Sequence, residues 1–342
     1  MRARLIPVGI ALALLLVCVT VFASCGQLLA TAAPSANLRS HGWAAVACGS
    51  DHTVALRKDG TLWAWGGNDA GQLGLGDTRD RHTPTRVGRA RDWSSVACSY
   101  ERTSALLAAR SLWTWGLNYR GDLGVSGARN RLTPTRVGHA RDWSSVACGY
   151  GYTLAVRRDG SLWAWGSNDA GQLGLGDTSA RRTPQRVGSA GDWATVTCGY
   201  QSSLAVKTDG SLWAWGYNGG GQLGLGDTRD RLTPTRVGRA SNWAAVACGY
   251  DFALAVKKHG SLWAWGHNYV GQLGLGDTTT RLTPTRVGTA TNWASVSCGD
   301  GDTLAVRRNG TLWAWGFNGN GELGLGDTEE RQTPTEVGSG SP

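Results

Sequence analysis

The stretch WSSVACGYGYTLAV at residues 143–156, followed by DGSLWAWGSNDAGQLGLGDT at residues 159–178, is one unit of a pattern that fills most of the chain. Tryptophans return every 50 residues in three parallel series, which together hold all 18 tryptophans of the 342-residue chain. A fixed period of this length is typical of a repeat architecture in which each repeat is one supersecondary unit. The sequence therefore contains six repeats, with first tryptophans at Trp43, Trp93, Trp143, Trp193, Trp243 and Trp293.

Each repeat predicts four short β-strands, which in the third repeat lie at residues 143–148, 153–158, 161–166 and 183–188. Asp159-Gly160 is a two-residue hairpin signal, because glycine accepts the positive φ that a type I′ turn requires. The second and third strands are apolar on both faces, so each sheet needs a cover on both sides. Radial packing of blades supplies that cover and leaves few free edges. We predict an all-β, six-bladed β-propeller of four-stranded antiparallel blades in a closed ring.

The same motifs resemble the repeat of the regulator of chromosome condensation family. The resemblance runs from Trp43 to Gly338 and rests on WG-x-N-x-x-G-Q-L-G-x-G together with a downstream proline and a Cys-Gly turn. It implies a propeller, in this family usually of seven blades, so that six repeats depart from the usual number. Which strands meet where the ring closes stays open.

The N-terminal residues 1–25 predict an export signal, since two arginines precede an apolar run from Leu5 to Ala23. Three outcomes are compatible with this segment. Phe22-Ala23-Ser24-Cys25 resembles a lipobox, which would make Cys25 a lipidation site, whereas Ala30-Thr31-Ala32 offers an ordinary cleavage site. The run is also long enough for an uncleaved membrane anchor. All three predict an exported chain, either a membrane-anchored lipoprotein or a secreted protein.

The rest of the chain divides by composition. Residues 26–42, rich in Ala and Ser, predict a flexible tether, residues 43–338 the propeller, and residues 339–342 a short tail. The formal net charge is +9, but much of it is periodic. One arginine series is expected to pair with an equally periodic aspartate series, as Arg181 with Asp177. Charges that recur once per blade belong to the scaffold, so nucleic-acid binding is not favoured.

Several motifs that could indicate a catalytic or ligand-binding site are better explained as parts of the scaffold. The six periodic cysteines predict buried thiols, because equivalent atoms of neighbouring blades reach disulfide distance only near the axis. The stretch GQLGLGDT lacks the lysine of a P-loop and recurs, so it predicts turns. The histidines show no ligand spacing, and no nucleophile stands beside a base in a local motif. We expect no metal, no cofactor and no enzymatic activity.

Two short windows vary between repeats while their flanks stay constant. One follows the Cys-Gly turn, and the other flanks the constant asparagine of WG-x-N. Strand direction places both windows on one face of the propeller, and their abundance of tyrosine is typical of binding surfaces. The predicted partner-binding residues are Asp51, His52, Tyr100, Glu101, Arg102, Tyr119, Arg120, Tyr150, Tyr152, Tyr200, Tyr217, Tyr250, Asp251, Phe252, His267, Tyr269 and Phe317.

The opposite face and the second repeat differ from this pattern. Basic residues around the hairpins, such as Lys58, Arg157 and Lys207, predict a basic ring on the opposite face. The second repeat has Ala109-Arg110 in the hairpin and Ser99 after the cysteine. Local departures from a consistent pattern accompany function or decay. We predict that this repeat forms the charged centre of the partner's footprint.

The leading functional hypothesis is a non-enzymatic exported propeller that binds a protein partner through the aromatic and charged loop face. One alternative is a lectin-like binder of envelope polysaccharide, because aromatic faces also stack on sugars. Another, by family analogy alone, is a guanine-nucleotide exchange factor. That role carries over poorly, since an export signal separates the chain from cytoplasmic GTPases. The membrane is expected as a partner only through an N-terminal lipid or anchor.

Overall fold

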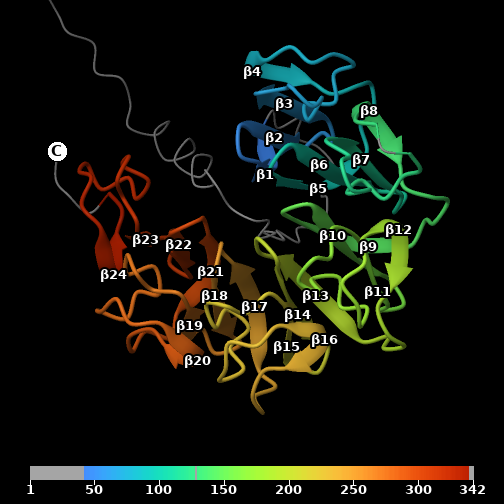
Figure 1. Ribbon diagram of the computed structural model, residues 1–342. Coiled ribbons are helices and arrows are strands. Elements are labelled where there is room, and N and C mark those ends of the chain that lie inside the picture. The colour runs from blue at the N-terminus through green and yellow to red at the C-terminus, as the bar shows by residue number, and fades with distance from the viewer. Residues whose placement is uncertain (1–41, 128, 339–342) are drawn as a thin grey trace, which may run out of the picture.

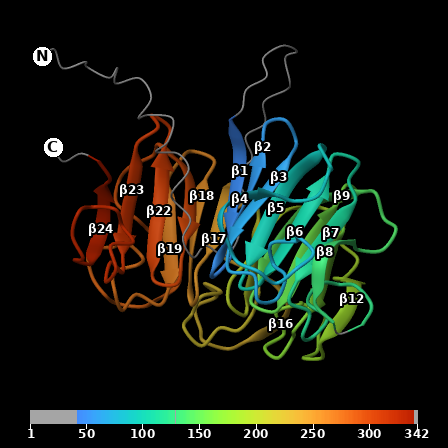
Figure 2. The same cartoon turned by 90° about the horizontal axis from the view of Figure 1, so that it is seen from above.

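The computed structural model describes residues 42–127 and 129–338. Within these residues there are 24 β-strands and no helix, grouped as six four-stranded antiparallel sheets of consecutive strands. The sheets stand around a common centre as the blades of a propeller (Figure 1). Viewed at right angles, the blades form a single layer and the strands run across its thickness (Figure 2). The predicted fold class, a six-bladed β-propeller, is confirmed.

The strand bounds repeat with the sequence period. Blade 1 contains β1 (Trp43–Cys48), β2 (His52–Arg57), β3 (Leu62–Gly66) and β4 (Arg81–Arg86). Blade 2 contains β5 (Trp93–Ser99), β6 (Arg102–Leu107), β7 (Leu112–Gly116) and β8 (Arg131–Arg136). Blade 3 contains β9 (Trp143–Gly149), β10 (Tyr152–Arg157), β11 (Leu162–Gly166) and β12 (Arg181–Arg186).

The second half of the chain repeats the same order. Blade 4 contains β13 (Trp193–Cys198), β14 (Ser202–Lys207), β15 (Leu212–Gly216) and β16 (Arg231–Arg236). Blade 5 contains β17 (Trp243–Cys248), β18 (Phe252–Lys257), β19 (Leu262–Gly266) and β20 (Arg281–Arg286). Blade 6 contains β21 (Trp293–Cys298), β22 (Asp302–Arg307), β23 (Leu312–Gly316) and β24 (Arg331–Glu336).

The hairpin between the second and third strands forms at the predicted place. It is not the predicted type I′ turn, because Asp159 does not have a positive φ and the backbone bonds join Arg157 to Gly160 and Ser161. Gly160 has φ +73°, and the Asp159 carboxylate accepts hydrogen bonds from the backbone N–H and the hydroxyl of Ser161 at 2.9 and 2.6 Å. In blade 2, Arg110 occupies the glycine position with φ +61°. A side chain in this left-handed region is strained, since its Cβ approaches the neighbouring backbone. The hairpin of the irregular second repeat is therefore strained at Arg110.

The hydrophobic core lies at the interfaces between neighbouring blades and not at the centre of the propeller. Between blades 1 and 2, for example, Val54 and Leu62 pack against Trp93 and Trp115. The indole N–H of Trp115 also donates a hydrogen bond of 2.9 Å to the backbone carbonyl of Gln72 in blade 1. The same bond recurs for Trp215, Trp265 and Trp315, which donate to Gln172, Gln222 and Gln272. One repeat thus binds the next through the tryptophan that the period preserves.

The periodic charges behave as scaffold, as expected. Arg181 lies 2.5 Å from the Asp177 carboxylate, and the equivalent pairs form in blades 1, 4, 5 and 6. Blade 2 has glycine in place of the aspartate, and there Arg131 donates to the backbone carbonyl of Ser126 at 2.6 Å. Of the six periodic cysteines, all thiols, five are buried and Cys48 is half-buried. The prediction of buried thiols is confirmed for those five.

The basic ring on the hairpin face needs a correction. Arg157, predicted as a solvent-facing charge, lies with its guanidinium 4.8 and 4.0 Å from the ring centroids of Trp143 and Trp163. Lys207, Lys257 and Arg307 are sandwiched in the same way by the tryptophans of their own blades. These cations are half-buried parts of the scaffold. The neighbouring Lys58, Arg158, Lys258 and Arg308 are exposed, as are Arg89, Arg91, Arg141 and Arg239 on the connections between blades.

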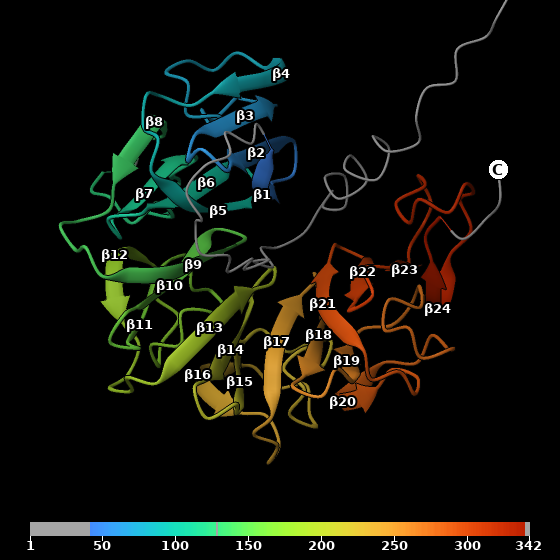
Figure 3. The same cartoon turned by 180° about the vertical axis from the view of Figure 1, so that it is seen from behind.

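The ring is open, contrary to the prediction of closure. Blades 1 and 6 stand apart, with β1 and β24 on opposite sides of a gap (Figure 3). Trp65 in blade 1 is half-buried, whereas its five equivalents are fully buried. Leu312 in blade 6 is half-buried, whereas Leu262 in blade 5 is fully buried. The similarity of the six repeat sequences did not indicate the gap, because closure of the ring depends on the angle at which each blade packs against the next.

Candidate functional site

The candidate site lies on the propeller axis, where the first strand of each blade turns into the second. First strands of neighbouring blades contact one another, so they form the innermost layer around the axis. The residue two positions after each periodic cysteine stands at this turn. In the six blades it is Ser50, Tyr100, Tyr150, Tyr200, Tyr250 and Asp300. The same position of each repeat thus contributes one side chain to a set that surrounds the propeller axis.

Four of these side chains form a stacked series, which we call the tyrosine ladder (Tyr100, Tyr150, Tyr200 and Tyr250). Ring centroids are 5.1 Å apart between Tyr100 and Tyr150 in an edge arrangement. They are 4.5 Å apart between Tyr150 and Tyr200, and 4.3 Å between Tyr200 and Tyr250, with both pairs stacked. Each ring comes from a different blade, so the ladder exists only in the assembled propeller. Its members remain accessible, with Tyr100, Tyr150 and Tyr250 about 40% exposed.

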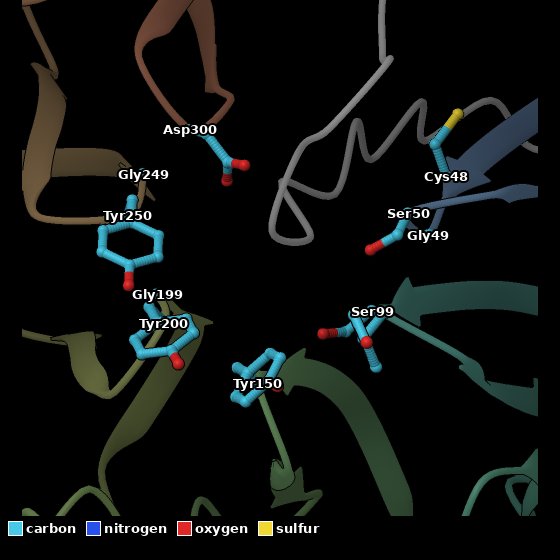
Figure 4. Close-up of a pocket in the computed structure, with 11 residues that line it drawn as sticks. Cys48, Gly49, Ser50, Ser99, Tyr150, Gly199, Tyr200, Gly249, Tyr250 and Asp300 are labelled. Carbon is cyan, nitrogen blue, oxygen red and sulfur yellow. The ribbon is translucent and has the colours of Figure 1, made fainter.

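The ladder lines a cavity of about 250 Å³, here called the axial pocket. Ser50, Ser99 and Asp300 complete its wall, together with backbone at the glycines that follow the cysteines. In Figure 4, Tyr150, Tyr200 and Tyr250 lie along one side, while Asp300 and Ser50 come from the two blades that border the gap. The sequence hypothesis did not select Ser50, Ser99 or Asp300. Their shared repeat position with the tyrosines was the signal that could have found Ser50 and Asp300.

The pocket is acidic at its mouth. Burial raises the pKa of Asp300, and burial together with the charges of Asp69 and Asp51 raises the pKa of Glu101. Burial and the neighbouring tyrosine and aspartate groups raise the pKa of Tyr250 to about 12. The phenol is therefore neutral at physiological pH, and it lies among carboxylates. A protein with an excess of basic residues thus presents an aromatic pocket with a carboxyl group, that of Asp300, in its wall.

Four predicted binding residues are in the wrong place for that role. His52, Arg102, Tyr152 and Phe252 are at most 3% exposed. They occupy the first position of the second strand, and with Ser202 and Asp302 we call them the wedge residues. The wedge side chain belongs to the second strand and is buried between blades, whereas the residue two positions earlier lies in the preceding turn and lines the axial side. The interpretation of these four as exposed contact residues is wrong.

Three of the wedge residues form hydrogen bonds to the next blade. The Tyr152 hydroxyl donates a 2.6 Å hydrogen bond to the backbone carbonyl of Ser202 and lies 3.2 Å from the Ser203 hydroxyl. His52 Nε2 lies 3.0 Å from the Thr103 hydroxyl of the next blade. The Arg102 guanidinium donates to the carbonyls of Gly149 and Asp122. Variation here accompanies a different set of contacts at each blade interface.

The wedge also explains the serine after the cysteine of the second repeat. At Gly149 an added Cβ would lie 2.1 Å from the ring of Tyr152, and Gly249 stands equally close to Phe252. The aromatic wedge therefore requires glycine at this position. In blade 2 the wedge is Arg102, whose guanidinium reaches away to blade 3, and Ser99 donates 2.7 Å to the Gly149 carbonyl. Ser99 is a compensated change in the inner layer.

The second window lies farther out, because it follows the third strand of each blade. Tyr119 and Tyr269 are 73% and 70% exposed, and Tyr217 and Phe317 are exposed at their edges. Arg120 pairs with Asp169 of blade 3. The His267 ring lies tilted against Tyr269, with centroids 4.7 Å apart, and its Nδ1 is 3.6 Å from the Asp251 carboxylate. Burial raises the pKa of Asp251. These residues surround the axial pocket on the same face as Asp51 and Glu101.

No group of three or more His, Cys, Asp or Glu side chains that could hold a metal ion occurs in residues 42–127 and 129–338. The same ranges contain no helix long and apolar enough to cross a membrane. The arrangement on the axis offers π-faces, hydroxyls and carboxylates to a ligand. Such groups bind cationic and apolar surfaces.

Known proteins share single repeats of this sequence. A segment of 42 residues is 57% identical to Ras guanine nucleotide exchange factor C of Dictyostelium discoideum, covering 12% of this chain and 3% of that protein. A 42-residue segment is 52% identical to the ultraviolet-B receptor UVR8 of Arabidopsis thaliana, covering 12% of this chain and 10% of that protein. The similarity to these relatives therefore spans a small part of their length.

Solved structures share the fold over most of the chain. Yeast RCC1 (Prp20), in its complex with Kap60, superposes with a TM-score of 0.76 at 24% identity, over 86% of this chain and 74% of that one. Human WBSCR16 superposes with a TM-score of 0.78 at 24% identity, over 92% and 88%. At this identity the likeness establishes the fold.

The family model of the regulator of chromosome condensation (RCC1) repeat matches six segments, at residues 59–106, 111–156, 159–206, 209–256, 259–306 and 309–341. A second RCC1 repeat model matches residues 43–72, 143–172, 193–222, 243–272 and 293–322. Together they cover nearly the whole propeller, in agreement with the motifs that carried the resemblance. The chain belongs to the RCC1 repeat family.

Proposed function

We propose that this protein is a non-enzymatic, exported propeller that binds a protein partner through the face containing the axial pocket. The tyrosine ladder is the observation that carries the proposal. Four large aromatic side chains from four blades stay partly accessible around one pocket, and Tyr100, Tyr150 and Tyr250 are each about 40% exposed. Tyrosine offers a wide contact area at low entropic cost and is enriched at protein interfaces.

The charge of the pocket specifies the partner's chemistry. Asp300 lies in the wall, and Glu101, Asp51 and Asp251 stand near the ladder. A lysine or arginine side chain inserted on the axis would meet π-faces and carboxylates together. The chain stacks cations on aromatic rings in its own scaffold, where Arg307 lies 3.7 Å from the centroid of Trp313. We therefore propose a partner that presents a basic side chain to the pocket.

The relatives support protein binding as the general mode. One is described as a Ras guanine nucleotide exchange factor, and yeast RCC1 is described in complex with Kap60. An exchange activity does not follow for this chain, because the similarity covers 3% of that exchange factor. The shared property that supports the proposal is a propeller used as a protein-binding scaffold.

Affinity capture from the native cell envelope tests the proposal. The bait is the propeller from Ala36 onward, compared with a Tyr150→Ser/Tyr200→Ser variant and with Lys258→Ser, an exposed position on the opposite face, as a control. We expect proteins that the wild type and the control capture and the ladder variant does not. If all three baits capture the same proteins, the ladder is not the binding site. Saturable binding to a glycan array, without any captured protein, would replace the proposal by the lectin-like alternative.

Export is the second part of the proposal and concerns residues outside the described range. We propose that residues 1–25 direct export and that Cys25 is lipidated. Cys25→Ala is then expected to abolish labelling by a fatty-acid probe and to release the protein from the membrane fraction. A wild-type protein that is never labelled and begins at Ala33 would instead be secreted. A full-length chain retained in the cytoplasm would refute export altogether.

A further inference from the structure

Each interior blade interface has two different halves. The leading blade supplies an aliphatic face and a backbone carbonyl, as Leu262 and Gln272 do in blade 5. The following blade supplies tryptophans and a hydroxyl, as Trp315 and Thr303 do in blade 6, both of which donate to the Gln272 carbonyl at 2.9 Å. A loop glycine of the leading blade also donates to the outer strand of the following one, at 2.9 Å from Gly276 to Gln332. The two halves are complementary and not interchangeable.

Blade 1 leaves the tryptophan half uncovered. Trp43, Trp65, Cys48 and Thr53 are half-buried, whereas Trp93, Trp115, Cys98 and Thr103 at the same positions of blade 2 are buried. In blade 2, Trp115 and Thr103 donate to the carbonyl of the preceding blade. Blade 1 has no preceding blade in residues 42–127 and 129–338. Its equivalents, Trp65 and Thr53, present the same donors toward the gap.

Blade 6 leaves the aliphatic half uncovered. The half-buried side chains are Leu304, Val306, Leu312 and Val337, whose counterparts Leu254, Val256, Leu262 and Val287 in blade 5 are buried. The loops agree with this difference. A Cβ added at Gly274 would lie 2.7 Å from the indole nitrogen of Trp315, but at Gly324 the nearest atom is Val337 Cγ1 at 3.7 Å. Among the described residues, no side chain fills the space that a tryptophan fills at the other interfaces.

Both uncovered halves face the same gap (Figures 1 and 3). An occupant that covers both must offer a tryptophan face to blade 6 and an aliphatic face with a carbonyl to blade 1. A single blade of this repeat type meets that requirement, as blades 2 to 5 each do between their neighbours. No blade of a second whole copy meets this requirement, because its interior blades are covered on both faces and its end blades have one uncovered half each.

We propose that the gap between blades 6 and 1 is a docking site for one four-stranded β-blade of this repeat type, supplied by another polypeptide. The Trp65 indole donates to a backbone carbonyl of the incoming blade. The incoming tryptophan packs over Gly324 and donates to the carbonyl of Glu322, the residue equivalent to Gln272. This site is separate from the axial pocket, and its occupation would complete the ring around that pocket.

The test uses the full chain and a separately tagged polypeptide of residues 189–238, which contains β13 to β16. Co-expression is expected to give a one-to-one complex with a melting temperature several degrees above that of the chain alone. Alkylation of Cys48, mapped by mass spectrometry, is expected to fall at least fivefold in the complex. Failure of capture in co-expression, or Cys48 as unreactive in the chain alone as Cys98, would overturn the proposal.

Matched substitutions locate the docking face. Leu312→Arg lies on the uncovered side of blade 6 and is expected to reduce capture at least tenfold with little change in the melting temperature of the chain alone. Leu262→Arg, at the same position of blade 5, is buried between blades and is expected to unfold the propeller. Capture that survives Leu312→Arg would contradict docking in the gap.

A fusion makes the test independent of whether the tagged fragment survives alone. Residues 189–238 are appended after Gly338 as a seventh repeat. The fusion is expected to raise the melting temperature and protect Cys48, and Leu312→Arg should cancel both effects. A fused blade that leaves Cys48 reactive would show that the gap does not accept a blade.

Discussion

Two positions of one variable window, separated by a single residue, have opposite environments in this propeller. Tyr150 is 41% exposed and stacks on Tyr200 at the axial pocket, whereas Tyr152 is fully buried and hydrogen-bonded to blade 4. The same contrast separates Tyr250 from Phe252. Variation between repeats therefore has two physical sources here. At the exposed position, side chains vary because they are not constrained by packing within the repeat. At the buried position, they vary because each pair of neighbouring blades is held together by different contacts.

The largest expected difference between Tyr150 and Tyr152 is the effect of their substitution on the stability of the folded protein. Replacing Tyr152 with serine empties a buried aromatic site and removes a hydrogen bond between blades, which is expected to cost about 4 kcal/mol of unfolding free energy. Tyr150→Ser removes a half-exposed ring and is expected to cost less than about 1 kcal/mol. Urea unfolding of the two single variants makes the comparison. Similar losses for both would mean that the ladder is structural.

Asp302 extends the comparison to pH. Burial, and secondarily the charges of Glu322 and Asp300, raises the pKa of this wedge carboxyl to about 7. The folded protein then binds a proton that the unfolded chain has released, so stability falls as the pH rises from about 4 and the loss is complete above about 7. Asp302→Asn is expected to stabilise the protein at pH 8, on the order of a few kcal/mol, and to have little effect at pH 4. Equal effects at both pH values would contradict the buried carboxyl.

His52 is predicted to show the opposite sign. Burial lowers the pKa of this wedge imidazole to about 4. The unfolded chain binds a proton below about pH 6.5 that the folded state refuses, so this stability is present above pH 6.5 and is lost as the pH falls toward 4. The expected change is on the order of 3 kcal/mol between pH 7 and 4. His52→Gln should flatten that part of the stability curve, and an unchanged curve would show that the imidazole titrates freely.

The irregular hairpin of blade 2 gives the smallest effect. Arg110 has a positive φ, and changing Ala109-Arg110 to Asp-Gly restores the turn of the other blades. We expect stabilisation of about 1 kcal/mol, measured by thermal or urea unfolding. The hairpin lies at the end of the blade opposite the axial pocket, so binding at the pocket should be unchanged. A weaker interaction with the partner would show instead that the irregularity of blade 2 is functional.

The sequence was sufficient to predict the structural features that recur in every repeat. It was insufficient to predict features that depend on the direction in which a side chain points. The tryptophan period, the Asp-Gly turns and the Arg181–Asp177 type of pair predicted the blades and their scaffold. The burial of Tyr152 was missed, because a loop-like window hides the point at which the strand begins and its side chains start to alternate. The tryptophan sandwich around Arg157 was missed because a periodic cation next to a turn has the same pattern whether it is solvated or stacked.

The axial pocket was half predicted. Its tyrosines stood out by composition, but their stacking depends on the radius of the inner layer, which no single repeat encodes. Asp300 and Ser50 share the position of the ladder but were not among the predicted contact residues. The open ring was missed for a related reason, since identical repeats do not specify the angle between blades.

The central claim is that the ladder position binds while the wedge position holds the blades together. The most direct measurement is the affinity of a hexa-arginine peptide for the wild type, for Tyr150→Ser/Tyr200→Ser and for the control Lys258→Ser on the opposite face, by titration calorimetry at low salt. Two lost cation–π contacts predict about a tenfold weaker affinity for the ladder variant, with a change below about twofold in the control. Equal affinities for the wild type and the ladder variant, at equal melting temperature, would contradict the account.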